Sequence, residues 1–190
     1  LLTDGRLLVV GGSNHRGGYL NSAELYDETA DTWTLAASMA SGRSGHTATL
    51  LSDGRVLVAG GHDGATPIAT SEIFNPTANT WSAAASLSER RVASESVLLT
   101  NGKVLVAGGW KEGAIIDTSE LFDPATGRWS PTSNRMSKGR YYFTLRQLPD
   151  GRVLAIGGDD NQSGGGMRDV DIYDPSTDRW TPTGALNMGR

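Results

Sequence analysis

The 190-residue chain contains no cysteine. Disulfide bonds, thiolate metal ligands and a cysteine nucleophile are therefore excluded, while the redox compartment stays open because a cysteine-free chain suits either kind. The sequence has no apolar run of about 18 residues, so we expect no membrane insertion. Its formal net charge of −4 gives no electrostatic reason to expect nucleic acid or an anionic membrane surface as a partner.

Convincing helical periodicity is also missing, and the chain shows instead one phrase that occurs four times. The second copy reads DGRVLVAGG over residues 53–61. The first glycine of the closing pair falls at Gly11, Gly60, Gly108 and Gly157, so the copies are 48 or 49 residues apart. A repeat of about 20 to 50 residues predicts a repeat architecture.

The second copy predicts four short strands within one repeat. Gly45–Leu51 is a β-rich run with loose alternation. Asp53–Gly54 then predicts a hairpin turn, because glycine adopts positive φ at little cost. Val56–Ala59 is apolar at every position, which predicts a strand buried on both faces. Ser71–Phe74 and Thr80–Ala83 are the third and fourth strands, separated by a turn that contains proline and asparagine.

Four further features recur in every copy. An acid lies two residues before the aromatic that ends the third strand, a tryptophan opens the fourth strand, and an arginine precedes the first strand of the next copy. These residues are Glu24, Glu72, Glu120 and Asp171; Tyr26, Phe74, Phe122 and Tyr173; Trp33, Trp81, Trp129 and Trp180; and Arg43, Arg91, Arg140 and Arg190. Their recurrence favours structural roles, with the acid needing a partner because an unpaired buried charge is costly. A ring of charges that grips a polar ligand is the alternative.

A four-stranded antiparallel unit of this length, repeated, is typical of one blade of a β-propeller. The glycine doublet, acid, aromatic and tryptophan together resemble the kelch repeat, in four copies over essentially the whole chain. The resemblance implies an all-β fold with one propeller region, 1–190, and approximate repeats 1–43, 44–91, 92–140 and 141–190. Kelch propellers usually have six or seven blades, so we expect four consecutive blades of a larger ring. A self-contained four-blade ring is the alternative. Open sheet edges on such a piece favour self-association.

Antiparallel strand order divides the connections between two faces. Turns between strands one and two and between three and four share one face, which we call the turn face. Loops between strands two and three and the linkers between blades share the other, the loop face. The variable segments lie on the loop face, so we place a binding site there. The candidate residues are His15, Arg16, Tyr19, His62, Asp63, Trp110, Lys111, Arg140, Tyr141, Tyr142, Asp159, Asp160 and Arg168.

Trp110 and the histidines need separate interpretation. Trp110 is the one tryptophan outside the repeat pattern, and its position in a variable loop makes it a candidate for stacking on a sugar ring. His15 and His62 both follow a glycine doublet, but no two histidines have a local metal-ligand spacing. We therefore interpret them as solvated loop residues and expect no metal site and no cofactor.

The segment RYYFT over residues 140–144 resembles the part of galactose and glyoxal oxidases in which an arginine, one further residue and a tyrosine open a first strand. In those enzymes the tyrosine is a copper ligand crosslinked to a cysteine, and Tyr142 is the matching position. The resemblance would place the cysteine around residues 92–97, where this chain has none, and the copper histidines in later blades. We therefore expect no copper-radical chemistry within these residues.

We interpret the chain as a kelch-type binding scaffold that recognises a protein or carbohydrate ligand through its loop face. The alternative is a fragment of a galactose- or glyoxal-oxidase-like enzyme whose catalytic residues lie outside this chain. A structural spacer within a cell-surface protein is a third interpretation. Regular, turn-rich repeats without cysteine suggest a bacterial protein that is extracellular or attached to the cell surface.

Overall fold

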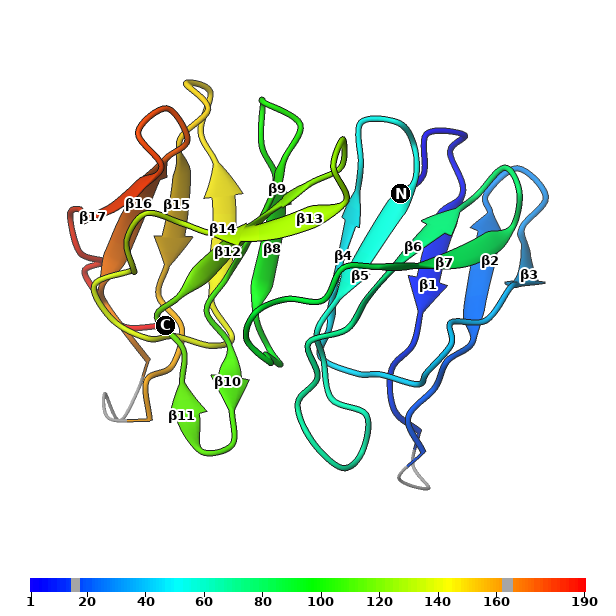
Figure 1. The fold of residues 1–190 in the computed structure, drawn as a ribbon, viewed down its shortest axis with the longest axis horizontal. Helices are drawn as coiled ribbons and strands as arrows, with labels where there is room; N and C mark the ends of the chain where they lie inside the picture. Colours follow the sequence, from blue (N-terminus) through cyan, green and yellow to red (C-terminus); the bar gives the residue numbers. More distant parts are fainter. Residues whose placement is uncertain (15–17, 162–165) are drawn as a thin grey trace.

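The computed structural model describes residues 1–14, 18–161 and 166–190, so the candidate residues His15 and Arg16 lie outside the described part. Within that part all regular secondary structure is β-strand, and no helix is present. The strands form four antiparallel sheets that follow one another along the chain, each built from one sequence repeat (Figure 1). We call these sheets blades 1 to 4.

Each blade keeps its strands in the order of the sequence, from the innermost to the outermost. Blade 1 contains β1 (Leu7–Val10), β2 (Ala23–Asp27) and β3 (Thr32–Ala36). Blade 2 contains β4 (Thr47–Leu50), β5 (Val56–Ala59), β6 (Ser71–Asn75) and β7 (Thr80–Ala84). Blade 3 contains β8 (Glu95–Leu98), β9 (Val104–Ala107), β12 (Ser119–Asp123) and β13 (Arg128–Pro131). Blade 4 contains β14 (Thr144–Gln147), β15 (Val153–Ile156), β16 (Val170–Asp174) and β17 (Arg179–Pro182). A small hairpin of β10 (Trp110–Lys111) and β11 (Ala114–Ile115) extends the loop after β9.

The predicted all-β blades are therefore confirmed, and the strand limits differ from prediction by a residue or two. β5 spans the predicted residues. The first strand of blade 2 starts at Thr47 and not at Gly45, because Gly45 has a φ of 61°, outside the extended region.

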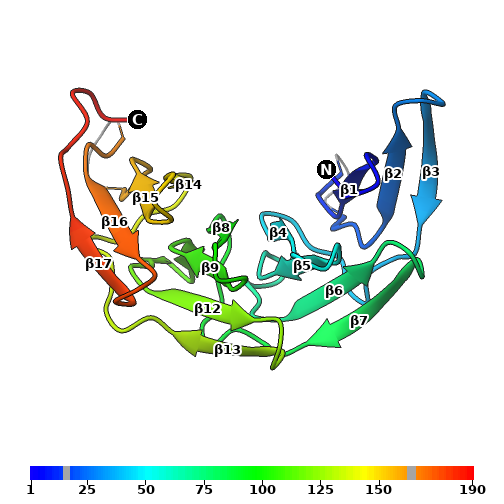
Figure 2. The same ribbon diagram turned by 90° about the horizontal axis from the view of Figure 1, so that it is seen from above.

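The four blades lie along an open arc, with β4, β8 and β14 on its inner side and β3, β7, β13 and β17 on its outer side (Figure 2). The two chain ends lie at the two ends of this arc (Figure 2). Four blades in an open arc are consistent with part of a propeller, as the sequence predicted.

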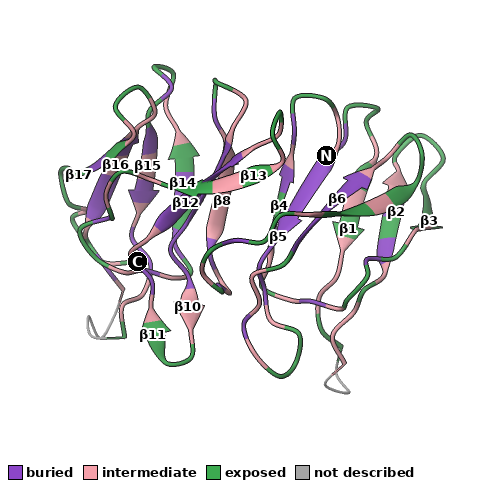
Figure 3. Ribbon diagram, in the orientation of Figure 1, coloured by how far each residue is buried: buried purple, intermediate pink, exposed green. Residues whose placement is uncertain are grey.

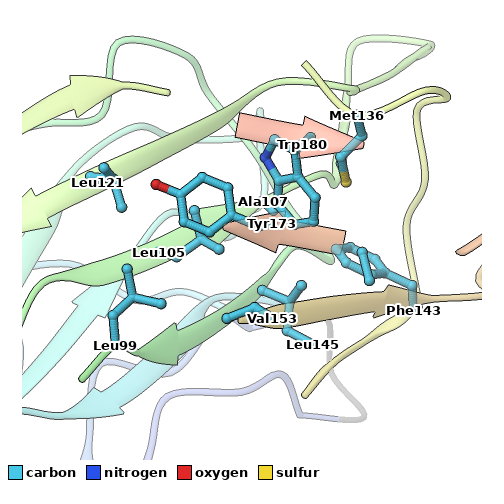
Figure 4. Close-up of a cluster of buried hydrophobic side chains, with 11 residues drawn as sticks. Leu99, Leu105, Ala107, Leu121, Met136, Phe143, Leu145, Val153, Tyr173 and Trp180 are labelled. Atoms are coloured by element: carbon cyan, nitrogen blue, oxygen red, sulfur yellow. The ribbon is translucent and has the colours of Figure 1, made fainter. Parts of the chain in front are cut away.

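Three hydrophobic clusters hold the arc together, one at each junction between blades. The junction of blades 1 and 2 buries Leu25 and Met39 against Val58 and Phe74. The other two clusters lie between blades 2 and 3 and between blades 3 and 4. In the last one, Tyr173 and Trp180 of blade 4 lie beside Leu105 and Leu121 of blade 3 (Figure 4). The core is thus a series of separate layers.

Layered packing explains why the second strands are apolar at every position. Successive side chains of a strand point to opposite faces of the sheet. In β5, Val56 and Val58 face blade 1 while Leu57 faces blade 3, and the whole strand is buried (Figure 3). β1 of blade 1 alternates instead between exposed and half-buried residues, because one face of this blade is uncovered.

Candidate binding site on the loop face

The recurring arginines and acids form clamps between blades. Arg91 has its main chain on blade 2, where its carbonyl oxygen accepts a hydrogen bond of 2.8 Å from the Gly61 N–H. Its side chain reaches blade 3, where Nη1 donates to the Gly108 carbonyl at 2.9 Å and Nη2 pairs with Glu120 Oε1 at 3.1 Å. The other carboxylate oxygen of Glu120 accepts from the Ser88 N–H at 2.8 Å. One arginine thereby joins two blades.

The same clamp occurs at the neighbouring junctions. Arg43 pairs with Glu72 at 2.7 Å, and Arg140 pairs with Asp171 at 2.5 Å. All three arginines are fully buried. Burial lowers the pKa of the Arg91 guanidinium from its ordinary value, and the charge of Glu120 opposes this shift. The predicted structural role of these acids is therefore confirmed, and Arg140, one of the candidate binding residues, is not accessible to a ligand.

The glycine doublets are explained by the contact between the arginine main chain and the blade on which it lies. A Cβ on Gly60 would lie 2.6 Å from the Arg91 carbonyl oxygen, closer than side-chain atoms approach. The residue also has a φ of 68°, which non-glycine residues rarely adopt. The first glycine of each pair is therefore required by the linker that crosses it, and not by a phosphate or another ligand.

The turn face is architectural. Within three of its Asp-Gly-Arg turns, the arginine pairs with the aspartate two residues before it at 2.7 Å. Hollows of 290, 360 and 390 Å³ recur on this face at equivalent places between successive blades. A feature present at every junction is explained by the repeat itself, so we do not assign it to a specific ligand.

On the loop face, the start of each first strand lies at the inner side of the arc. Gly45, Ala93 and Tyr142 occupy this position in blades 2, 3 and 4, and their φ values are 61°, 54° and 50°. The Ala93 N–H donates to the Gly45 carbonyl at 2.9 Å, and the Tyr142 N–H donates to the Ala93 carbonyl at 3.4 Å. This line of hydrogen bonds forms an inner rim across three blades.

Tyr142 differs from its counterparts in size and exposure. Its side chain is 78% exposed, although aromatic side chains normally bury their large apolar surface. A bulky residue in the left-handed region is an outlier whose backbone strain costs of order 1–3 kcal/mol, and such strain concentrates at functional sites. The inner rim therefore presents a strained, exposed aromatic residue where blades 2 and 3 have small residues.

Tyr141 connects Tyr142 to a hollow between blades 3 and 4. The two rings lie 5.0 Å apart between centroids, and the Tyr141 hydroxyl donates to Asn161 Oδ1 at 2.6 Å. Asn161 is also part of the lining of a 520 Å³ hollow together with Gly113, Ile115, Lys138, Gly139 and Asp160. This volume is within the range of ligand pockets in proteins, about 300–1,000 Å³. We call Tyr141, Tyr142 and this hollow the tyrosine site.

A second group of candidates lies between blades 1 and 2. The rings of Tyr19 and His62 are 5.4 Å apart between centroids, and both residues are half-buried. Asp63 is exposed, but its carboxylate accepts hydrogen bonds from the main-chain N–H groups of Ala65 and Thr66, which lower its pKa. Asp63 therefore has a local role in shaping its loop.

The other candidates are separated from the tyrosine site or used locally. Trp110 is half-buried in β10 and exchanges two main-chain hydrogen bonds with Val92. Lys111 pairs with Glu89, and Arg168 is exposed with its Nε donating to the Leu186 carbonyl at 2.7 Å. Of the predicted set, the structure brings together Tyr141, Tyr142, Asp159 and Asp160, because Asp159 exchanges two main-chain hydrogen bonds with Tyr141 and Asp160 lines the hollow.

Sequence reasoning missed the rest of the tyrosine site. Lys138, Gly139 and Ile115 line the hollow but lie in segments that carry no motif. A comparison of the three repeats that contain this position would have singled out Tyr142, because Gly45 and Ala93 occupy the same place in blades 2 and 3.

The surroundings of Tyr142 bear on the resemblance to copper oxidases. Tyr142 contacts Ala93 through its main-chain N–H, so its neighbour is the segment where the crosslinked cysteine would lie. The chain has no cysteine. Within residues 1–14, 18–161 and 166–190, no group of three or more His, Cys, Asp or Glu side chains could hold a metal ion.

No helix in the described part is long and apolar enough to cross a membrane.

Repeated antiparallel blades with buried arginine clamps define a β-propeller repeat protein. A family model described as the KLHDC2/KLHL20/DRC7 Kelch-repeats domain matches residues 1–158, and one described as the Kelch motif matches residues 149–187. Because the first match spans most of the sequence, the chain belongs to the kelch-repeat family.

A solved structure agrees with the fold. The protein in "Structure of YjhT" is similar with a TM-score of 0.77 and 16% sequence identity, over 98% of this chain and 64% of that one. At this identity the likeness shows the fold alone, and the chain spans 64% of the length of that protein. No curated protein matches the chain.

Proposed function

We propose that this kelch-repeat scaffold binds a protein segment on its loop face, with Tyr142 as the central contact. The observation that carries the proposal is the pairing of strain and exposure at Tyr142, at a position filled by Gly45 and Ala93 in the preceding blades. Tyrosine is enriched at protein interfaces because its ring offers a large contact area and its hydroxyl a polar contact.

The surroundings of Tyr142 suit an extended segment of a partner. The inner rim offers a continuous edge across blades 2 to 4, and the adjoining hollow offers both an apolar contact at Ile115 and charged groups at Lys138 and Asp160. A partner side chain that enters the hollow would fix the register of a segment lying along the rim.

Carbohydrate recognition is the second candidate. An exposed aromatic ring next to amide and carboxylate groups, here Asn161 and Asp160, is an arrangement that stacks on a sugar and hydrogen-bonds its hydroxyls. The two candidates differ in ligand and share the same residues, so one variant tests both.

The experiment uses Tyr142→Gly, which removes the ring and keeps a backbone that Gly45 already adopts in blade 2. A peptide display library is selected on the wild-type chain and counter-selected on the variant. We expect enriched peptides to bind the wild type at least tenfold more tightly than Tyr142→Gly. Leu35→Ala is the matched control, because Leu35 is 79% exposed on another surface, and it should leave binding unchanged.

The same proteins are then applied to an array of defined glycans. Binding of a glycan that Tyr142→Gly abolishes, without enriched peptides, would replace the protein candidate with the carbohydrate candidate. If neither library contains a ligand that distinguishes the wild type from Tyr142→Gly, a binding role for the tyrosine site is rejected.

A further inference from the structure

Glu95 is a carboxylate on the innermost strand of blade 3 that no cation within the described part of the chain neutralises. It begins β8, which lies on the inner side of the arc (Figure 2). Its side chain is half-buried. Burial raises the pKa of its carboxyl above the ordinary value, and among the described residues no charge or hydrogen bond opposes this shift. The carboxylate is therefore partly removed from water without gaining a partner.

The neighbouring blades have a neutral residue at the same position. Glu95, Thr47 and Thr144 each stand opposite the residue that precedes a glycine doublet. Thr47 is buried, and its hydroxyl donates to the Ala59 carbonyl at 3.4 Å. A half-buried charge without a partner costs free energy that a threonine avoids. Blade 3 thus departs from the repeat at this position at a cost to its own stability.

The Glu95 side chain faces the junction of blades 3 and 4. Its cross-strand partner Ala107 belongs to the hydrophobic cluster between these two blades, and cross-strand partners point to the same side of a sheet. The innermost strands β8 and β14 are in contact at this junction. Both blades that flank the carboxylate are therefore present, and the described residues of neither supply a cation to it.

The carboxylate lies beside the inner rim. Glu95 follows Ala93 by two residues, and the Ala93 carbonyl accepts a hydrogen bond of 3.4 Å from the Tyr142 N–H. An unpaired carboxylate and an exposed tyrosine ring thus come from neighbouring blades beside the same rim. Carboxylates pair with amino and guanidinium groups, and aromatic rings attract the same cations. A metal ion would need further ligands, and the described residues contain no group of three or more that could hold one.

We infer that Glu95 binds a primary amine or a guanidinium group, carried by a lysine or arginine side chain of a partner segment on the inner rim. The identity of the partner as a protein segment rests on the proposed function, and the new element is the positive charge that this segment must carry. The cation pairs with the Glu95 carboxylate, and its apolar stem packs against the ring of Tyr142. Binding thereby supplies the countercharge that the fold itself does not.

Three capped tripeptides test the need for a positive charge: acetyl-Gly-Lys-Gly-amide, acetyl-Gly-Arg-Gly-amide and the neutral acetyl-Gly-Met-Gly-amide. Each is titrated into the isotope-labelled chain, and nuclear magnetic resonance follows the main-chain amide signals of Ala93, Glu95 and Tyr142. We expect the lysine and arginine peptides to shift these signals saturably and the methionine peptide to leave them unchanged. The tighter of the two cationic peptides identifies the kind of side chain that the site prefers.

Glu95→Gln removes the charge and keeps the shape of the side chain. It should weaken binding of the cationic peptides by about tenfold or more, because a charged hydrogen-bonded pair is lost. Glu112→Gln is the matched control, since Glu112 lies on the loop face in the turn of the β10–β11 hairpin and its side chain is 62% exposed. This control should bind the cationic peptides as tightly as the wild type.

Thermal unfolding shows whether the carboxylate is needed by the fold. The midpoints of Glu95→Gln and of Glu95→Thr, which installs the residue of blades 2 and 4, should equal or exceed that of the wild type. A lower midpoint for both variants would show that the carboxylate has a partner within the fold, and would overturn the inference. The absence of saturable shifts with either cationic peptide would also overturn it, as would equal binding by the wild type and Glu95→Gln.

Peptides from the display selection separate this inference from the proposed function. Selected peptides that need Tyr142 and bind Glu95→Gln as tightly as the wild type would support the proposed function and reject the cation site. Cationic tripeptides that need Glu95, without any selected peptide that needs Tyr142, would support the cation site and reject the proposed function.

Discussion

The guanidinium of Arg140 and the carboxylate of Asp171 lie 2.5 Å apart, and neither side chain has any solvent exposure. The arginine is anchored to blade 3 by its main chain, and the aspartate belongs to β16 of blade 4. The carboxylate also accepts hydrogen bonds from the N–H and hydroxyl of Ser137. A buried ion pair therefore holds two blades together at their junction.

Removing that carboxylate leaves the arginine buried without its countercharge. We expect Asp171→Ala to lower the free energy of unfolding by about 3–5 kcal/mol, since breaking a buried ion pair costs this much. Glu24→Ala removes the acid at the same repeat position where it is exposed and unpaired within one chain, and should change stability by less than about 0.5 kcal/mol. Urea unfolding of both variants at low protein concentration measures the difference. Equal effects of the two variants would contradict the clamp.

Two glycines with similar backbone conformations allow the stability cost of a steric clash to be separated from the cost of a positive φ. Gly108 and Gly127 have φ values of 62° and 67°, but a Cβ on Gly108 would lie 2.5 Å from the Arg140 carbonyl oxygen, while none lies within 4 Å at Gly127. We expect Gly127→Ala to cost about 1 kcal/mol for the left-handed conformation alone. Gly108→Ala should cost at least about 2 kcal/mol more, because the linker must move. Thermal and urea unfolding give both values, and similar losses would show that the close approach is unimportant.

His46 should make stability depend on pH. Burial lowers its pKa to about 4, and the charge of Arg43 adds to the shift. Its Nδ1 is buried without a hydrogen-bond partner in the described part of the chain. Between the ordinary pKa of 6.5 and about 4, the unfolded chain binds a proton that the folded chain does not, so stability falls as pH decreases through this window.

The variant His46→Ser isolates this effect, because Ser94 occupies the equivalent position in blade 3. From about pH 7.5 to about pH 4.5 the wild type should lose up to about 3 kcal/mol more than His46→Ser. The difference between the two proteins cancels the titration of the carboxylates that they share. Parallel pH profiles would show that His46 is protonated in the folded state as easily as in the unfolded one.

Tyr142 should oppose stability. Replacing it by glycine relieves the positive φ without removing a buried contact, so Tyr142→Gly should raise the free energy of unfolding by about 1 kcal/mol. Urea unfolding measures the gain, and a loss of stability would show that the ring supports the rim. A variant that is more stable and binds less would show that the strain is retained for binding.

Most of the fold could be predicted because the repeat displays each constraint four times. The run at residues 56–59 predicted a strand buried on both faces, since no polar residue interrupts it, and β5 is buried throughout. The acid at Glu72 predicted a buried partner, and Arg43 provides it. Strand limits were less certain at Gly45, where a positive φ delays the strand.

The candidate site was harder to predict because it depends on contacts between segments far apart in the sequence. Tyr142 was a candidate through a local motif, but its strain and its exposure follow from the inner rim, which one repeat does not reveal. Arg140 was also a candidate, although its recurring position in the repeat already favoured a structural role. In the structure it forms a buried ion pair with Asp171. Lys138 and Ile115 reach the tyrosine site only because blades 3 and 4 lie side by side.

The clamps also bear on how such a chain grows or shortens. At each of the three junctions, an acid of one repeat receives the arginine that ends the repeat before it. A tandem duplication of one unit between consecutive arginines would bring both halves of a complete junction, and a deletion of one unit would leave the remaining junctions matched. Blade number can therefore change by whole units without any substitution at the interfaces, so the size of the propeller is open to recombination within the gene while its local packing stays the same.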